Sequence, residues 1–189
     1  MGKIIAEITM SLDGFIAGPG ITTKDPMGIK GQSLHEWIFA KATKADKAML
    51  TELMDSTGAV ILGHRTYSTA MDAWGGVSPF RSAAFVLCHR MPSKPVSGFD
   101  YVTDGIDEAL VQAREVAGNK NIWVMGGANV IQQYLKAGLI EEFRLHIAPM
   151  LLMRGTRLFD NVGSDPAQWV KESVTETPGA VHILLRIKK

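Results

Sequence analysis

Two adjacent glycines, Gly126 and Gly127, join a short apolar segment to a segment of helical pattern. Because neither glycine has a Cβ, the backbone can approach a ligand closely at this point. The helix that follows would direct unpaired N–H groups and a partial positive charge at the same place. In an α/β protein this arrangement is typical of a site for the phosphate or pyrophosphate of a nucleotide. A tight turn that binds nothing has the same local pattern, so the rest of the chain must decide between the two.

Two other apolar segments also lead into residues that can hold an anion. These residues are Gly63, His64, Arg65 and Thr66 after one segment, and Leu87, Cys88, His89 and Arg90 at the end of the other. The carboxyl ends of parallel strands meet at one edge of a sheet, so we expect these donors to surround the two glycines. An arginine matches a phosphate with two parallel hydrogen bonds, whereas the bare ribose of NAD usually takes a carboxylate. The residues therefore favour NADPH as the cofactor.

Apolar segments alternate with segments of helical pattern through the first two thirds of the chain. Strands are expected at residues 3–11, 59–63, 83–88, 99–103 and 121–126. Helices are expected at residues 34–42, 44–55 and 64–72, between Asp104 and Gly118, and from Gly127 to Gly138. A glycine-rich loop fills the sequence from Leu12 to about Gln32; Gly58 is expected to close the second helix and Asp104 to cap the fourth.

The last third of the chain has a different pattern. Residues 141–148 alternate with period two, with Arg144 and His146 on the polar side, which indicates the edge of a sheet. Residues 169–177 and 181–188 flank Pro178-Gly179 and predict a terminal hairpin. We therefore expect a three-layer α/β fold, with a mostly parallel central sheet, helices on both faces and an antiparallel C-terminal hairpin.

The overall composition limits the class of partner. At 189 residues with 46% hydrophobic content, the chain can bury one substantial core, and we expect a single domain over residues 1–189. A formal charge of +1 and the lack of a basic run argue against nucleic acid and membrane surfaces and favour a small molecule. Cys88 is the single cysteine, no secretion-type leader is seen, and no apolar run reaches the ~20 residues of a membrane span. These features predict a cytoplasmic location.

Five motifs in order resemble the dihydrofolate reductase superfamily, most of all the C-terminal reductase domain of bifunctional riboflavin-biosynthesis proteins and its stand-alone relatives. They are Ser11–Ala17, Leu62–Tyr67, Val86–His89, Val124–Asn129 and the segment from Pro149 through Gly155 to Phe159. The resemblance spans nearly the whole chain and implies a dihydrofolate reductase-like fold with NADPH-dependent hydride transfer. It departs from the folate enzymes after the first loop, where those enzymes hold the pterin with an acidic residue and Glu36 is not clearly in register.

The resemblance also assigns cofactor contacts by position. The loop after the first strand would touch the nicotinamide carboxamide, and the turn after residue 62 would bind the pyrophosphate and adenosine side. The end of the strand at 83–88 would hold the adenine and 2′-phosphate region. The glycine turn, in which the family often has a cis peptide bond, would cradle the pyrophosphate. The implied cofactor-binding residues are Ile16, Ala17, Gly63, His64, Arg65, Thr66, Leu87, Cys88, His89, Gly126, Gly127, Ala128, Asn129 and Val130.

Three residues are candidates for the substrate pocket. Asp13 lies in an Asp-Gly turn, Trp37 could stack on a planar substrate, and His146 lies on a strand that borders the pocket in the family. Each also has a purely structural interpretation, as does Cys88 in its apolar strand. The histidines have no metal-ligand spacing, so we expect no metal site. The proton needed beside the hydride could come from water, Asp13 or His146, and the catalytic residue stays open.

The leading hypothesis is an NADPH-dependent reductase of a small heterocyclic substrate, of the 5-amino-6-(5-phosphoribosylamino)uracil reductase type. The alternatives are a dihydrofolate or pterin reductase and a non-catalytic NADPH-binding dimer. A homodimer is expected in any case, because the terminal hairpin and the apolar residues 148–153 could pair across a two-fold axis.

Overall fold

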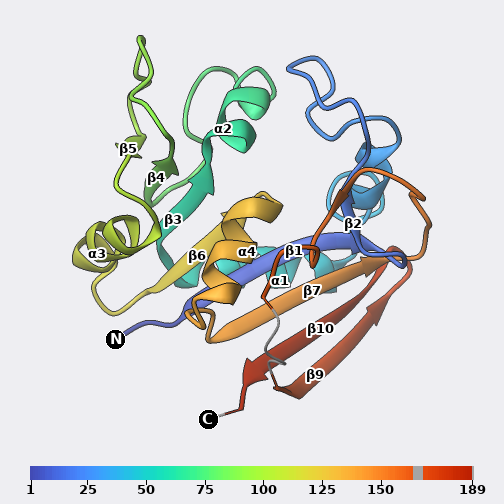
Figure 1. Cartoon of the computed structure of the whole chain (residues 1–189). Helices are drawn as coiled ribbons and strands as arrows, with labels where there is room; N and C mark the ends of the chain where they lie inside the picture. Colours follow the sequence, from blue (N-terminus) through green and yellow to red (C-terminus); the bar gives the residue numbers. More distant parts are fainter. Residues whose placement is uncertain (164–167, 189) are drawn as a thin grey trace.

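The computed structural model describes residues 1–163 and 168–188, and an eight-stranded sheet forms its centre (Figure 1). The strands follow the order β5-β4-β3-β6-β1-β7-β10-β9. Their bounds are β1 Ile4–Ser11, β3 Thr57–Gly63, β4 Ala83–Leu87, β5 Asp100–Val102, β6 Asn121–Gly126, β7 Glu142–Ala148, β9 Trp169–Thr177 and β10 Ala180–Ile187. The first six strands of the order pair in parallel, and β10 pairs antiparallel with both β7 and β9. The expected parallel sheet with an antiparallel terminal hairpin is confirmed.

Helices cover both faces of this sheet. The helices α3 (Ile106–Ala117) and α4 (Ala128–Lys136) pack on one face, where Ile61 and Val124 join their core. The helix α2 (His64–Ala70) packs on the other face, against Val60 and its neighbours. Helix α1 (Lys44–Ser56) lies behind the sheet in Figure 1, opposite α4. Since both faces are covered, strands such as β3 are continuous apolar runs instead of alternating ones.

The register of the parallel strands brings the three polar turns to one edge of the sheet. Gly63 at the end of β3 lies beside Leu87 at the end of β4, and Leu62 lies beside Gly126 at the end of β6. The expectation that these strand ends share an edge is confirmed, and the edge is where ligands bind in open parallel sheets.

The loop expected from Leu12 to Gln32 has more structure than its glycines indicate. It contains β2 (Phe15–Ala17), which pairs antiparallel with β8 (Thr156–Arg157), and it leads into the short 3-10 helix η1 (Gly31–His35). The expected helix over residues 34–42 is wrong, because only η1 and a series of turns occur there. A two-residue strand such as β8 has no periodicity of its own and forms only when a distant partner meets it.

The position of β7 was also predicted wrongly, because it lies between β1 and β10 and not at an edge. Its alternation is real, but its polar side faces other protein groups: His146 is only 4% exposed and Glu142 only 2%. The sequence pattern suggested that the polar side of this strand faces solvent, but in the structure it forms a buried polar layer.

Two expected helix ends differ in detail. Helix α3 is preceded by Gly105 with φ 94°, and the Asp104 carboxylate accepts a hydrogen bond from the Thr103 hydroxyl instead of capping the helix. Gly58 lies inside β3 and does not close α1. A Cβ on Gly58 would lie 2.8 Å from backbone atoms of Ala117, so this glycine lets the end of α3 approach the sheet.

Within the described part of the chain, every helix is too short or too polar to span a lipid bilayer.

Candidate functional site

A cavity of about 320 Å³ opens at the carboxyl edge of the parallel strands. Its walls come from β1, β2, η1, α2 and the turn between β6 and α4, so segments far apart in the sequence meet there. The wall is largely apolar, with a few polar groups, which is the usual character of a site for a small organic ligand. The lining residues are Ile8, Ile16, Ala17, Ile21, Pro26, Met27, Gln32, His35, Phe39, Arg65, Thr66, Thr69, Ala70, Ala73, Trp74, Met125, Gly127, Ala128 and Thr156.

One wall of the cavity is built for close approach to a ligand. The Gly127 N–H donates to Thr66 Oγ1 at 2.8 Å, which ties the glycine turn to α2. A Cβ on Gly127 would lie 3.2 Å from that oxygen, and a Cβ on Gly63 would lie 2.9 Å from Val130 Cγ2. The peptide bond between Gly126 and Gly127 is cis, as the resemblance implied. The turn therefore has no room for side chains and presents its backbone to the cavity.

The first turn of α4 supplies hydrogen-bond donors beside this turn. Gly127 is the N-cap and has no side chain with which to cap the helix. The N–H groups of Val130 and Ile131 already bond to the Gly127 carbonyl, at 3.1 and 3.2 Å. The N–H groups of Ala128 and Asn129 are then the free donors of a helix start, where the dipole favours an anion. Together with Arg65, these donors make the wall suitable for an anion such as a phosphate.

A different wall of the cavity contains His35, at the end of η1. Its Nδ1 atom is buried and has no hydrogen-bond partner among the described residues. Burial lowers the pKa of His35 to about 4; the Gly31 backbone opposes this shift, and the charge on His146 adds to it. The imidazole is therefore neutral at pH 7.

The structure brings some of the expected cofactor residues together and leaves others apart. Ile16, Ala17, Arg65, Thr66, Gly127 and Ala128 line the cavity. Gly63 and Gly126 form the backbone turns beside it, while the Val130 side chain belongs to the core. The residues outside the lining also include His64, Asn129 and His89, which are exposed, Leu87, which ends β4, and Cys88, which follows it.

The three candidates for the substrate pocket all lie outside the lining of this cavity. The Asp13 carboxylate accepts from the N–H groups of Leu152 (3.1 Å) and Met153 (2.8 Å) and from the Ser11 hydroxyl, so it holds two loops together. The hydrogen bond from Ser11 is the largest cause that lowers the pKa of Asp13. Trp37 and His146 lie side by side, with ring centroids 4.5 Å apart, and both are buried.

Sequence reasoning missed several lining residues, above all His35, Phe39 and Trp74. Their segments carry no regular periodicity, because η1 is a short 3-10 helix and Trp74 lies in turns after α2. The sequence drew attention to Glu36, but this residue pairs with Lys41 at the surface. Its neighbour His35 faces the cavity, and only the fold of the preceding loop determines which of the two does so.

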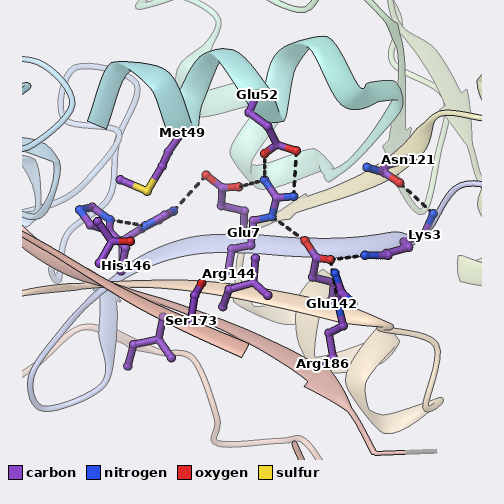
Figure 2. Close-up of a pocket in the computed structure, with 14 residues that line it drawn as sticks. Lys3, Glu7, Met49, Glu52, Asn121, Glu142, Arg144, His146, Ser173 and Arg186 are labelled. Carbon is purple, nitrogen blue, oxygen red and sulfur yellow. Dashed lines mark hydrogen bonds and ion pairs between the residues drawn. The ribbon is translucent and has the colours of Figure 1, made fainter. Parts of the chain in front are cut away.

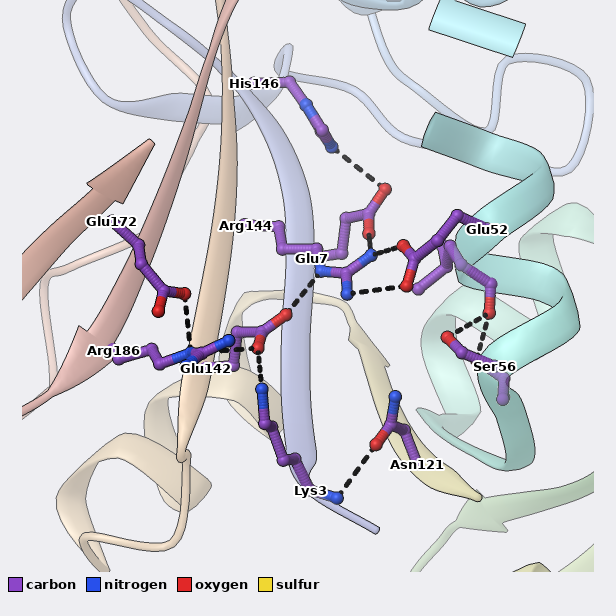
Figure 3. A network of polar contacts seen from close by, with 12 residues as sticks. Lys3, Glu7, Glu52, Ser56, Asn121, Glu142, Arg144, His146, Glu172 and Arg186 are labelled. Carbon is purple, nitrogen blue, oxygen red and sulfur yellow. Dashed lines mark hydrogen bonds and ion pairs between the residues drawn. The ribbon is translucent and has the colours of Figure 1, made fainter. Parts of the chain in front are cut away.

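A second cavity, of about 380 Å³, lies on the α1 face of the sheet (Figure 2). Arg144 lies at its centre and forms ion pairs with Glu142 (2.8 Å), Glu52 and Glu7 (3.8 Å), as Figure 3 shows. Burial alone would raise the pKa of Glu142, but hydrogen bonds from Lys3 and Arg144 outweigh it and lower that pKa. Lys3 and Arg186 have carboxylate partners as well. The charges of this cavity thus satisfy one another, which makes it a poor site for an anionic ligand.

The fold and the first cavity define a class: an α/β protein of the dihydrofolate reductase-like superfamily, with a ligand cavity at the carboxyl edge of its parallel sheet. The family model described as the RibD C-terminal domain matches residues 2–183. The chain therefore belongs to the RibD C-terminal domain family.

Three known proteins illustrate this relationship. The uncharacterized protein YyaP of Bacillus subtilis (strain 168) is 25% identical over 96% of this chain and 93% of its own length. A crystal structure from Shewanella sp. PV-4, named as a candidate riboflavin biosynthesis protein, has a TM-score of 0.78 at 20% identity, with each chain fully covered. The diaminohydroxyphosphoribosylaminopyrimidine deaminase/5-amino-6-(5-phosphoribosylamino)uracil reductase of Thermotoga maritima has a TM-score of 0.67 at 15% identity, covering 99% of this chain and 57% of that one.

Proposed function

We propose that the protein is an NADPH-dependent reductase that acts on a small heterocyclic substrate, of the 5-amino-6-(5-phosphoribosylamino)uracil reductase type. The observation that carries the proposal is the convergence of Arg65, Thr66, Gly127 and Ala128 on one wall of a cavity at the carboxyl edge of the parallel strands. Membership of a family with reductases among its structural relatives supports the same reaction class.

Each part of the cavity has a role in this proposal. The free N–H groups at the start of α4 and the Arg65 guanidinium would bind the phosphates. Backbone at Ile16 and Ala17 would orient the nicotinamide, which supplies the hydride when bound. The apolar side chains of Ile8, Phe39 and Trp74 would exclude water and hold a planar ring beside it.

A pterin substrate has less support. Among the described residues, no aspartate or glutamate lines the cavity, whereas the folate enzymes hold the pterin with an acidic group. Glu36, which follows His35 in the chain, is paired with Lys41 at the surface.

Calorimetry with NADPH and NADH tests the cofactor. We expect NADPH to bind at least about tenfold more tightly, since a 2′-phosphate adds charge-assisted hydrogen bonds worth about 1.4 kcal/mol or more. The absence of binding by either dinucleotide at millimolar concentration would refute the proposal.

Loss of NADPH absorbance in the presence of 5-amino-6-(5-phosphoribosylamino)uracil, dihydrofolate or a flavin tests the reaction. Turnover of the first compound supports the proposal, and turnover of dihydrofolate alone would favour pterin reduction instead. Binding of NADPH without oxidation of it by any of these compounds would favour the non-catalytic alternative.

A further inference from the structure

Among the described residues, His35 is the side chain of the cavity wall that can take up and release a proton. Among the described residues that line the cavity, the ionisable ones are His35 and Arg65. A guanidinium does not release its proton in proteins, so Arg65 can bind charge but cannot act as an acid. The other polar side chains of the wall are amides and hydroxyls, as in Gln32, Thr66 and Thr156.

The two nitrogens of the His35 ring have different surroundings. Nδ1 is buried without a hydrogen-bond partner among the described residues. Nε2 is not a buried, unpaired atom; the polar contact of the ring is with the Gly31 backbone, and since His35 lines the cavity, Nε2 is the nitrogen that a ligand there can reach. A ligand in the cavity can therefore reach Nε2 directly.

The position of η1 puts His35 on the side of the cavity that β2 forms. The 3-10 helix packs against β1 and β2, and Ile16 and Ala17 of β2 also line the cavity. The phosphate wall comes from other elements, because Thr66 of α2 bonds to Gly127 before α4. His35 thus belongs to the end at which the proposed function puts the nicotinamide and the substrate.

We infer that His35, through Nε2, contacts the substrate and supplies the proton that the reduced double bond takes up. Reduction of a carbon–heteroatom double bond adds a hydride to the carbon and a proton to the heteroatom. The imidazolium form of His35 is the donor: its Nε2–H bond breaks, the heteroatom–H bond forms, and the neutral imidazole that remains takes up a new proton from water. The inference rests on the proposed function, because the hydride comes from the bound dinucleotide.

The surroundings of the ring determine how activity should depend on pH. On its own segment, Glu36 is paired with Lys41; from β1 and β7, Glu7 and His146 face each other; and Arg65 lies in the same cavity wall. No carboxylate among the described residues bonds to His35, and burial holds its pKa near 4. The protonated fraction in the free protein therefore falls about tenfold for each unit of pH above that value.

The first test asks whether Nε2 faces the ligand, and it needs no substrate. Diethyl pyrocarbonate modifies neutral imidazoles, and peptide mass spectrometry of the full chain would measure the rate at His35 with and without saturating NADPH. We expect NADPH to slow the modification of His35 about tenfold or more, by covering the open cavity. Equal rates with and without NADPH, in a protein that calorimetry shows to bind it, would overturn the inference and leave the cofactor proposal intact.

The second test concerns the proton. With the compound that the wild type reduces, kcat/KM should fall about tenfold per pH unit between roughly pH 6 and pH 8. His35→Gln should lower kcat about 100-fold or more, remove this dependence and leave the NADPH dissociation constant unchanged. Glu36→Gln, one residue along and paired at the surface, is the matched control and should behave as the wild type.

An unchanged pH profile in His35→Gln would overturn the inference even if the variant is slower. A wild type that binds NADPH but reduces none of the compounds would instead contradict the proposed function, so the two failures are distinguishable.

Discussion

His146 and His182 face each other across β7 and β10 with their Nδ1 atoms 2.7 Å apart. At this distance one ring donates its Nδ1–H and the Nδ1 of the other ring accepts. At most one of the two rings can therefore carry protons on both of its nitrogens in this arrangement. The outer nitrogens lie 3.0 Å from Glu7 Oε1 and 3.1 Å from Asp46 Oδ1. Trp37 packs on both rings, at 4.5 and 4.9 Å between centroids. The pair thus joins the hairpin, α1 and the segment after His35.

Stability should fall as the pH is lowered from about 6.5 to 4. Burial and the neighbouring His146 lower the pKa of His182, and burial lowers that of His35 to about 4. As the pH falls, both histidines therefore take up protons in the unfolded chain at a higher pH than in the folded protein, which favours unfolding. For His35 alone this is worth about 3 kcal/mol, fully present above pH 6.5 and lost as the pH falls toward 4. Urea unfolding at several pH values measures it.

Two comparisons check the origin of that loss. His35→Gln should flatten the pH dependence in this window, because its amide does not titrate. Glu142 affects stability at lower pH than the histidines. Its pKa lies below the ordinary 4.5, so its contribution to stability is lost only as the pH falls below that value. A wild type as stable at about pH 4.5 as at about pH 7.5 would contradict the prediction.

Thr66→Val should weaken NADPH binding and leave the fold intact. The substitution keeps the shape of the side chain but removes the oxygen that accepts from the Gly127 N–H at 2.8 Å. We expect about 1–2 kcal/mol lower stability and about a tenfold higher NADPH dissociation constant, as the glycine turn loses its anchor. Thr103→Val, at an exposed hydroxyl that donates to Asp104, is the control and should change neither quantity. Equal NADPH affinity in the two variants would show that the hydrogen bond between Thr66 and Gly127 does not contribute to NADPH binding.

Arg144→Met should destabilise the protein by about 3–5 kcal/mol, because it removes the guanidinium that the buried Glu7 and Glu142 share and leaves Glu142 to Lys3 and Arg186. Denaturant unfolding measures the loss. NADPH binding at low temperature should be unchanged, since this network lies outside the cavity at the carboxyl edge of the parallel strands. The control is Arg81→Gln, which breaks an exposed pair with Asp55 at 3.8 Å and should cost less than about 0.5 kcal/mol. A similar cost for both substitutions would show that the Arg144 network contributes little.

The homodimer stays a prediction, and the outer strand β9 is the surface on which to test it. This strand is the edge of the sheet, and its Val170 and Val174 are 50% and 45% exposed. Light scattering should give about twice the chain mass of 20.6 kDa. Val174→Lys should return the protein to the monomer mass, because a charge on the strand opposes edge pairing. A wild-type particle of one chain mass would remove the dimer.

The sequence by itself determined the features that depend on neighbouring residues. An apolar run followed by glycines and a helical pattern predicted β6, the Gly126-Gly127 turn and α4, and the same device predicted β3 with α2. The chain direction of such units then put their turns at one edge of a parallel sheet, which is why Thr66 and Gly127 were expected together.

Only the tertiary structure decided which polar side chains face the cavity and which face each other. His35 lines the cavity and Glu36 does not because β2 pairs with the distant β8 and fixes the course of the loop before η1. His146 is buried against His182 because β10 returns beside β7 and α1 covers that face. These relationships depend on contacts between residues far apart in the chain, and local propensity and periodicity do not predict such contacts.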